Sequence, residues 1–453
     1  MKSPGARSAE RTANSTLTLH LAFLSMGYQV GVWAFSLPVV VDRLQMSVQQ
    51  LGFALALMAI TSIAGSLVAG RLAATRGPSE LMAWSLVWSG LGYALMSYLG
   101  SFVTFSVLAG LTGFGLGLLD VAANVRGAAV EAEQARTLLP RLHALFSLAA
   151  AVGALTAFVM TGDQSLIVAF LVAGVSCIVT GVLVIVRKGD LAASDPAAAA
   201  DDVENGSSWA DDLRFMRKTA IAFAFVLVCC AFTLDATLEG FSALFIRQLP
   251  FQGAAQSAIG LAALYLAGAT GRACASLVIR RFGEWRTVLV GQAVATLGVI
   301  MLVSSPVAGA SAVGMLLIGI GMSPIAPIAY SVIGRSYTAA DPGRATAYLT
   351  AAGYVTFVLA PIIIAFVGRD SVAKAFQLLP VLLVAMAVMT IWFGHQERVA
   401  ARRAVQCAPL HCPQRTEQTL CGSTDGRSRS AVRERAAVWR CPGPHGDSGQ
   451  WDD

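Results

Sequence analysis

Residues 165–188 read SLIVAFLVAGVSCIVTGVLVIVRK, and this stretch decides the class of fold. The first twenty-two residues carry no charge, and an Arg–Lys pair follows at once. A helix needs about 20 apolar residues to cross a bilayer, and only a backbone that satisfies its own hydrogen bonds can do so. The stretch therefore predicts a transmembrane helix that ends in a basic loop.

Eleven further apolar stretches of similar length lie before and after it. The predicted spans are 19–41, 51–72, 80–99, 103–125, 143–162, 165–186, 219–241, 257–279, 287–305, 307–333, 346–367 and 373–394. The chain of 453 residues is 56% hydrophobic and 13% charged, with a mean hydropathy of +0.67. Soluble proteins carry about 25% charged residues, so the composition predicts an all-α membrane protein with twelve transmembrane helices.

The Lys and Arg residues alternate with the predicted spans. If the N-terminus lies inside, the inner segments up to residue 344 hold eighteen of them and the outer loops hold four. Basic loops stay on the cytoplasmic side, so we expect both termini in the cytoplasm and the protein in the plasma membrane, the inner membrane of a bacterium. The same rule accounts for the net charge of +6. We therefore expect the lipid bilayer, and no nucleic acid, as a partner.

The spans form two halves that resemble each other. The predicted parts are an N-terminal tail (1–18), a six-helix bundle (19–186), a cytoplasmic linker (187–218), a second six-helix bundle (219–394) and a disordered tail (395–453). GRLAATRG (70–77) matches SLVIRRFG (276–283), and Gly-x-Gly recurs at 115–117 and 319–321. Such repeats predict two bundles around a midplane site, with alternating access by rocking of one bundle against the other.

Four stretches carry a resemblance to a known family. They are GLGLLDVAANVRGAAVE (115–131), LHALFSLAAAVGAL (142–155), LEGFSALFIRQL (238–249) and GYVTFVLAPIIIAFVG (353–368). Together they resemble the major facilitator superfamily of secondary transporters, and within it the fucose-permease-like branch. The resemblance implies the major facilitator fold and a small-molecule substrate.

The loop between the second and third spans departs from that family. Its motif usually reads Gly-x-x-x-Asp-Arg-x-Gly, and here Gly70, Arg76 and Gly77 are present while Ala74 and Thr75 replace the acid and the first Arg. In the eighth helix, Ser276 stands where relatives usually carry an acid. In the family these acids help to latch the cytoplasmic side, so a standard latch is not expected.

Two acids in the seventh span are the first candidates for proton coupling. Asp235 and Glu239 share one helix face by their i,i+4 spacing, and ionisable groups in spans are functional candidates. We expect Glu239 near the outer end of the span and Asp235 one turn deeper, where the pair can share or relay a proton. The alternative is an interfacial carboxylate that bonds loop amides.

A second polar group is predicted towards the inner side. Asp120 and Asn124 share a face of the fourth span and can bind the substrate, take up a proton, or fix this helix to the next loop. His143 opens the fifth span beside them, as a structural or a functional residue. We expect Arg272 in an inner network between the bundles, more than as a substrate anchor. On ideal helices it would lie about 16 Å from Asp235 in depth.

Gln29 and Trp33 in the first span are candidates for the substrate pocket, because an amide beside an indole suits a sugar; the alternative is plain helix packing.

The leading hypothesis is a proton-coupled secondary transporter of a small polar solute, active as a monomer. Proton-driven efflux of drugs or metabolites is the runner-up, and a non-transporting sensor or scaffold is the alternative from another class. There is no nucleotide-binding loop, and we predict no enzyme activity, no cofactor and no metal site.

Overall fold

The computed structural model describes residues 4–134, 138–160, 165–187, 219–304, 307, 309–336 and 342–406. The predicted linker, apart from Arg187, and the tail beyond Gln406 lie outside these residues. Packing of the backbone divides the chain into a unit of residues 1–401 and a second unit from residue 402 onwards. All contacts described below lie within the first unit.

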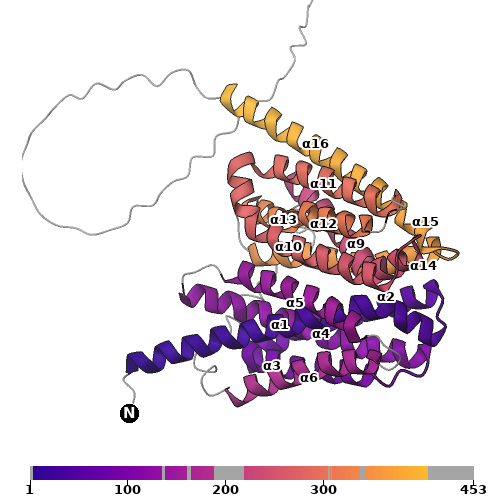
Figure 1. Ribbon diagram of the computed structural model, residues 1–453. Helices are drawn as coiled ribbons and strands as arrows, with labels where there is room; N and C mark the ends of the chain where they lie inside the picture. The colour runs from indigo at the N-terminus through magenta and orange to yellow at the C-terminus, as the bar shows by residue number, and fades with distance from the viewer. Residues whose placement is uncertain are drawn as a thin grey trace, which may run out of the picture. The chain divides into compact units, whose positions relative to one another are not determined.

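Every regular element of the described chain is a helix. The first half contains α1 (Pro4–Leu44), α2 (Val48–Arg76), α3 (Pro78–Met96), α4 (Phe102–Gln134), α5 (Leu139–Met160) and α6 (Ser165–Val186). The second contains α9 (Thr219–Gln248), α10 (Ala254–Phe282), α11 (Glu284–Ser304), α12 (Ala310–Met322), α13 (Ile325–Ser336), α14 (Pro342–Val367), α15 (Val372–Phe376) and α16 (Leu378–Gln406). The fold is that of twelve transmembrane helices in two six-helix bundles, and Figure 1 shows the bundles as two groups of near-parallel helices.

Hydropathy alone selects ten helices of the described chain as long and apolar enough to span a membrane. The other two crossings are α14, of which Ala351–Val367 is apolar, and α3. The α3 helix has nineteen residues with several Ser and Gly. These small residues are buried against other helices, while large apolar side chains of the same helix, Trp84, Trp88, Leu91 and Leu95, are exposed.

Several helices are longer than the sequence predicted. The α9 helix continues to Gln248, seven residues past the predicted end, because Ser242 is buried and Arg247 has an acidic partner. The α16 helix continues to Gln406, so the chain is still helical where a disordered tail was predicted from residue 395. The tenth crossing is divided into α12 and α13 at Ser323–Pro324, since proline has no N–H to continue the helix.

The repeat between the halves appears in two one-residue turns. Gly77 joins α2 to α3 at φ +83°, and Gly283 joins α10 to α11 at φ +79°. Each glycine N–H bonds the carbonyl four residues back, to Ala73 (3.1 Å) and Ile279 (2.8 Å). Only glycine adopts this backbone conformation without strain, which explains why both halves carry it at the same place.

Close helix contacts hold each bundle together. Gly27 and Gly31 of α1 lie against the carbonyls of Phe146 and Ala150 of α5, where a Cβ atom would collide with the backbone. Such small residues let transmembrane helices approach closely. Between the bundles, α5 packs on α10 and α2 packs on α14.

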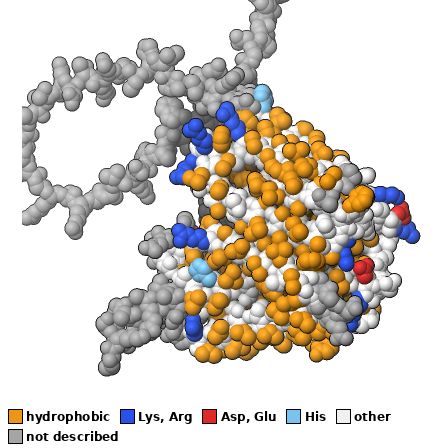
Figure 2. Space-filling view, viewed as in Figure 1, with side chains coloured by type: hydrophobic (Ala, Val, Ile, Leu, Met, Phe, Trp, Pro, Cys, Tyr) orange, Lys and Arg blue, Asp and Glu red, His pale blue; other side chains and the backbone are white. Residues whose placement is uncertain are grey.

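The surface separates a lipid-facing band from two charged ends. The face in Figure 2 is largely hydrophobic between charged side chains at either end. We call the end with Arg71, Arg76, Arg280 and Arg281 the basic side. The opposite end, with Arg43, Arg247, Arg369 and Lys374, is the far side.

Candidate functional site

The acids of α9 lie deeper than the sequence suggested. The helix ends at Gln248, so Glu239 is about 14 Å and Asp235 about 20 Å from its far-side end at 1.5 Å per residue. The expectation that Glu239 lies near the outer end is therefore wrong. Asp235 occupies the middle of α9, and its depth differs from that of Arg272 in α10 by roughly 8 Å instead of 16 Å. The error came from placing the end of α9 too early.

Asp235 and Glu239 face the interior without a fixed partner. Both side chains are half-buried, and among the described residues neither forms a hydrogen bond or an ion pair. Glu239 interacts electrostatically with Asp235, Arg272 and the phenols of Tyr265 and Tyr93. Tyr93 belongs to the first bundle and Tyr265 to the second, so Glu239 lies where the two bundles meet.

A polar cluster closer to the basic side joins α4, α5 and α14. Asn124 donates to Oδ1 of Asp120 over 2.9 Å, and its Oδ1 lies 3.2 Å from Nε2 of His143. The phenol of Tyr354, from the second bundle, donates to Oδ2 of Asp120. The structure thus brings Asp120, Asn124 and His143 together and adds Tyr354, which joins the two bundles through them.

Arg272 makes another polar contact between the bundles. Its Nη1 donates to the hydroxyl of Ser147 on α5 over 2.6 Å. Ser147 lies one turn from His143, so this contact adjoins the cluster around Asp120. Both Arg272 and His143 are exposed, although their helices span the membrane.

Gln29 and Trp33 lie within the first bundle instead of between the bundles. Gln29 is fully buried; it accepts a hydrogen bond from Ser89 (2.9 Å), and its carbonyl accepts one from Tyr93 (3.1 Å). Trp33 is buried and stacks on Phe105 with ring centroids 5.7 Å apart. This geometry favours helix packing over direct contact with a solute in the present conformation.

A second amide and two methionines of the membrane helices are also buried in the cores. Gln292 is buried between α11 and α16, where it bonds Thr390 over 2.9 Å. Met26 and Met322 belong to hydrophobic clusters. The loop-motif residues Gly70 and Arg76 are exposed at the basic end of α2, away from the two polar groups.

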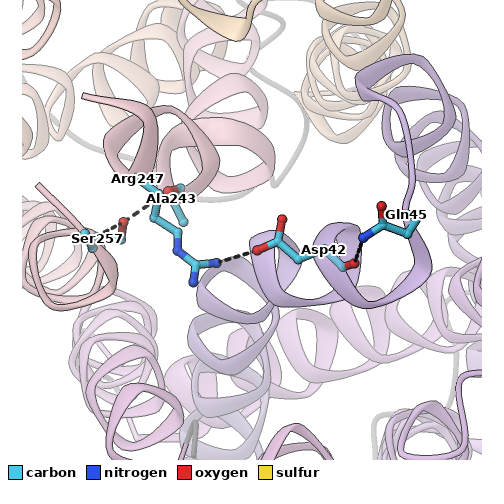
Figure 3. Close-up of polar contacts among 6 residues, drawn as sticks. Asp42, Gln45, Ala243, Arg247 and Ser257 are labelled. Atoms are coloured by element: carbon cyan, nitrogen blue, oxygen red, sulfur yellow. Dashed lines mark hydrogen bonds and ion pairs between the residues drawn. The ribbon is translucent and has the colours of Figure 1, made fainter. Parts of the chain in front are cut away.

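The far side is closed. Arg247 of α9 reaches Asp42 of α1 with Nη1 and Oδ2 3.4 Å apart, as Figure 3 shows. Gln45 holds the end of α1 by donating to the Asp42 carbonyl (2.6 Å), and Ser257 ties α10 to α9 through the Ala243 carbonyl (3.0 Å). Beneath this layer one hydrophobic core continues from α1 and α2 into α9 and α10. On the basic side, by contrast, the second core belongs to the first bundle alone.

Three residues of this region were missed from the sequence. Tyr354, Ser147 and Tyr265 are uncharged, and charge inside a span was the signal that selected candidates. Tyr354 and Ser147 do lie within two of the stretches that carried the family resemblance. Tyr265 lies seven residues before Arg272, on the same face of its helix.

Comparison with known proteins identifies related chains. The family model described as Major Facilitator Superfamily matches residues 19–317. An uncharacterised MFS-type transporter of Yersinia pestis is 25% identical over 376 residues, which is 82% of this chain and 94% of the relative. An uncharacterised transporter of Sinorhizobium fredii is 22% identical over 354 residues, covering 78% and 90%.

Solved structures share the fold. The nucleoside transporter NupG superposes with a TM-score of 0.64 at 11% identity, covering 84% of this chain and 98% of its own. A bacterial homologue of the human lysosomal transporter Spinster, in an inward-facing and unoccupied conformation, superposes with a TM-score of 0.63 at 13% identity. It covers 87% of this chain and 98% of its own.

Proposed function

The chain belongs to the Major Facilitator Superfamily, and from this premise we propose that it is a proton-coupled secondary transporter that moves a small polar solute by alternating access. The observation that carries the proposal is the position of Asp235 and Glu239. Two carboxylates stand at the middle of the membrane, between the bundles, with no hydrogen bond or ion pair to a described residue. Charged groups at this depth are costly and mark ion pathways.

Protonation gives these acids a role in the transport cycle. An ionised carboxylate opposes its own burial when the bundles close around a solute, and a protonated one does not. Proton and solute then both favour the same closed arrangement, and a ligand shifts such an equilibrium by its difference in affinity for the two states. This linkage couples solute movement to the proton gradient.

We place the basic side in the cytoplasm of the plasma membrane, the inner membrane in a bacterium, with both termini there and with the monomer as the active unit. The excess of Lys and Arg on that side supports this orientation. The closed far side then makes the present conformation inward-facing. The resemblance to the fucose-permease-like branch, in residues 115–131 above all, supports a hydroxylated solute such as a sugar.

Proteoliposomes containing a pH-sensitive dye test the proposal. We expect a transported solute to drive proton movement with the wild-type protein and with Asp370→Asn, which removes an exposed acid outside the membrane. Glu239→Gln should abolish this proton movement while the protein stays folded. Unchanged coupling in Glu239→Gln would show that the acid has no such role.

The direction in which solute and protons move distinguishes uptake from proton-driven efflux. A solute that enters together with protons supports uptake, whereas a drug or metabolite that moves against them supports efflux. Deletion of residues 407–453 addresses the scaffold hypothesis. If the protein is a transporter, solute flux should be unchanged after this deletion. If it is a scaffold that acts through its basic tail, binding of its partner should be lost.

A further inference from the structure

Arg272 leans towards the N-terminal end of α10, as long helical side chains do, and does not extend towards the nearer membrane interface. Long basic side chains normally extend towards the nearer interface, which for Arg272 is the basic side. Here the guanidinium lies back over Gly268, one turn towards the middle of the membrane; a Cβ built on that glycine is 3.5 Å from Nη1 and 3.8 Å from Cζ. A Cβ at this position would be in ordinary van der Waals contact with the guanidinium, so the Arg272 side chain packs along Gly268.

The charge of Arg272 has no acidic partner at contact distance. Among the described residues, no Asp or Glu lies within ion-pair distance of its guanidinium, whereas Arg247 and Lys374 at the far side do pair with acids, Asp42 and Asp370. The partner of Arg272 is the neutral hydroxyl of Ser147, which occupies Nη1. The side chain is exposed, so other donors of the guanidinium stay available. A guanidinium has five N–H donors in a planar fork that matches a carboxylate.

We propose that Arg272 is the binding residue for a carboxylate on the transported solute, which makes the substrate a small organic anion. The inference deepens the transport function proposed above and rests on it. Ser147 fixes one edge of the guanidinium and leaves the opposite edge for a bidentate contact, the strong geometry for this pair. Further along the same face of α10, the buried hydroxyl of Tyr265 has no hydrogen-bond partner among the described residues and can bind a polar group of the same solute.

The same residue couples the anion to protons. The positive charge of Arg272 acts on Asp235 and on Glu239, so these carboxylates compete with the carboxylate of the solute for one cation. Protonation of an α9 acid removes a competitor and strengthens binding of the anion. By linkage, the bound anion favours uptake of the proton to the same extent. Symport of an anion with protons follows from this competition.

Other ionisable groups face this region. They are Asp120 on α4, His143 on α5, Tyr93 on α3 and Tyr265 on α10. The two phenols stay neutral between pH 6 and pH 8, because a tyrosine ordinarily titrates at about pH 10. The His143 imidazole gains positive charge as the pH falls, which would also favour an anion. A His143→Gln variant separates its contribution from that of the α9 acids.

Binding to the purified full-length protein tests the proposal with matched probes. Each carboxylate is paired with a neutral counterpart of similar shape: glucuronate with glucose, gluconate with sorbitol, and lactate with 1,2-propanediol. Thermal shift and calorimetry are recorded at pH 6 and pH 8. We expect a carboxylate to bind more tightly than its counterpart, with an affinity that rises up to about tenfold per pH unit on acidification for one linked proton.

Variants at position 272 decide the role of the arginine. Arg272→Gln should remove the preference for the carboxylate, and Arg272→Lys, which keeps the charge but not the fork, should retain part of it. Arg280→Gln, an exposed arginine two turns further along α10, is the matched control and should bind as wild type. If Arg272→Gln does not fold, Arg272→Lys still shows whether the preference for the carboxylate needs the guanidinium, and His143→Gln shows how much of the pH dependence comes from the imidazole.

Each outcome is decisive. The proposal is wrong if no carboxylate shifts the melting temperature more than its neutral counterpart, or if Arg272→Gln keeps the preference. A neutral probe that binds in a pH-dependent way abolished by Glu239→Gln would overturn the anion but preserve proton-coupled transport. A carboxylate that binds through Arg272 but is never moved with protons in proteoliposomes would overturn the transport function instead.

Discussion

The phenol of Tyr354 on α14 donates a hydrogen bond to the carboxylate of Asp120 on α4, and so joins the two bundles within the membrane. Asp120 is held from its own helix by Asn124. The acids that latch the family's cytoplasmic loops are replaced by Ala74 and Ser276 in this chain. The contact between Tyr354 and Asp120 supplies a polar link between the bundles at a deeper level.

Tyr354→Phe should weaken this link and little else, because the ring keeps its packing against Phe232 and Phe357. A hydrogen bond to a charged group contributes about 1.5–3 kcal/mol, and Asp120 keeps its bond from Asn124, so we expect a loss of stability near the lower value. Thermal unfolding in detergent measures it. Tyr98→Phe, at a tyrosine 75% exposed, is the control; equal melting temperatures for the two variants would contradict the expectation.

The turn glycines should tolerate no side chain. At φ +83° and +79°, Gly77→Ala and Gly283→Ala each place an L-residue in a strained conformation that costs about 1–3 kcal/mol. Gly70→Ala is the matched comparison, since this exposed glycine lies inside α2 with open space around it. Replacing it should stabilise the helix by about 0.5–1 kcal/mol. The opposite signs of the two effects can be read from melting temperatures, and destabilisation at position 70 would refute the argument.

Arg247→Gln should shift the protein towards the conformation that is open on the far side. The pair with Asp42 joins α1 to α9 at the surface, and such pairs contribute up to about 1 kcal/mol, which corresponds to a shift of up to fivefold. Cys274 is exposed near Arg272 on α10, so its labelling by a maleimide should slow as the basic side closes. The tail cysteines are first replaced by serine.

Lys374→Gln is the control for that shift, because it breaks a surface ion pair within one bundle, with Asp370 at 2.8 Å. Labelling of Cys274 should stay at the wild-type rate. If both variants slow labelling equally, the Asp42–Arg247 pair has no specific part in closing the far side.

Asp370 should contribute nothing to the pH dependence of transport. The hydrogen bond and charge of Lys374 lower the pKa of the Asp370 carboxyl below its ordinary value. The carboxylate therefore stays ionised as the pH falls from about 8 to 5, and its contact with Lys374 is lost only below that range. Flux profiles of Asp370→Asn and wild type should superimpose. A profile displaced in this variant would mean that proton uptake involves the far-side loop.

The crossings of the membrane could be predicted from the sequence, because length and hydropathy decide them. Helix ends could not, because hydropathy placed the end of the seventh span at residue 241, whereas α9 continues to Gln248 and its Arg247 pairs with Asp42. That one difference moved Glu239 and Asp235 from the outer part of the membrane to its middle. The sequence could not show what a buried polar residue faces, so Gln29 was a pocket candidate while it bonds Ser89 inside the first bundle.

From the sequence, the depth of Arg272 favoured an inner network between the bundles over a role as substrate anchor, and this stays a prediction. Its neutral partner Ser147 carries no charge to mark it. Tyr354 is also uncharged, so a search for ionised groups within the spans does not select it. Residue type identifies an unusual charge, and only the packing of helices tells which side chain it meets.

The hydrophobic core runs from the first bundle into the second on the far side. Its burial makes the equilibrium between the two conformations depend on temperature. Opening that side exposes part of this core, and newly hydrated apolar surface raises the heat capacity of the state that is open on the far side. Hydrophobic contact weakens on cooling. Cold should therefore favour the state that is open on the far side, and the equilibrium between the two states should curve with temperature instead of following a straight van't Hoff line.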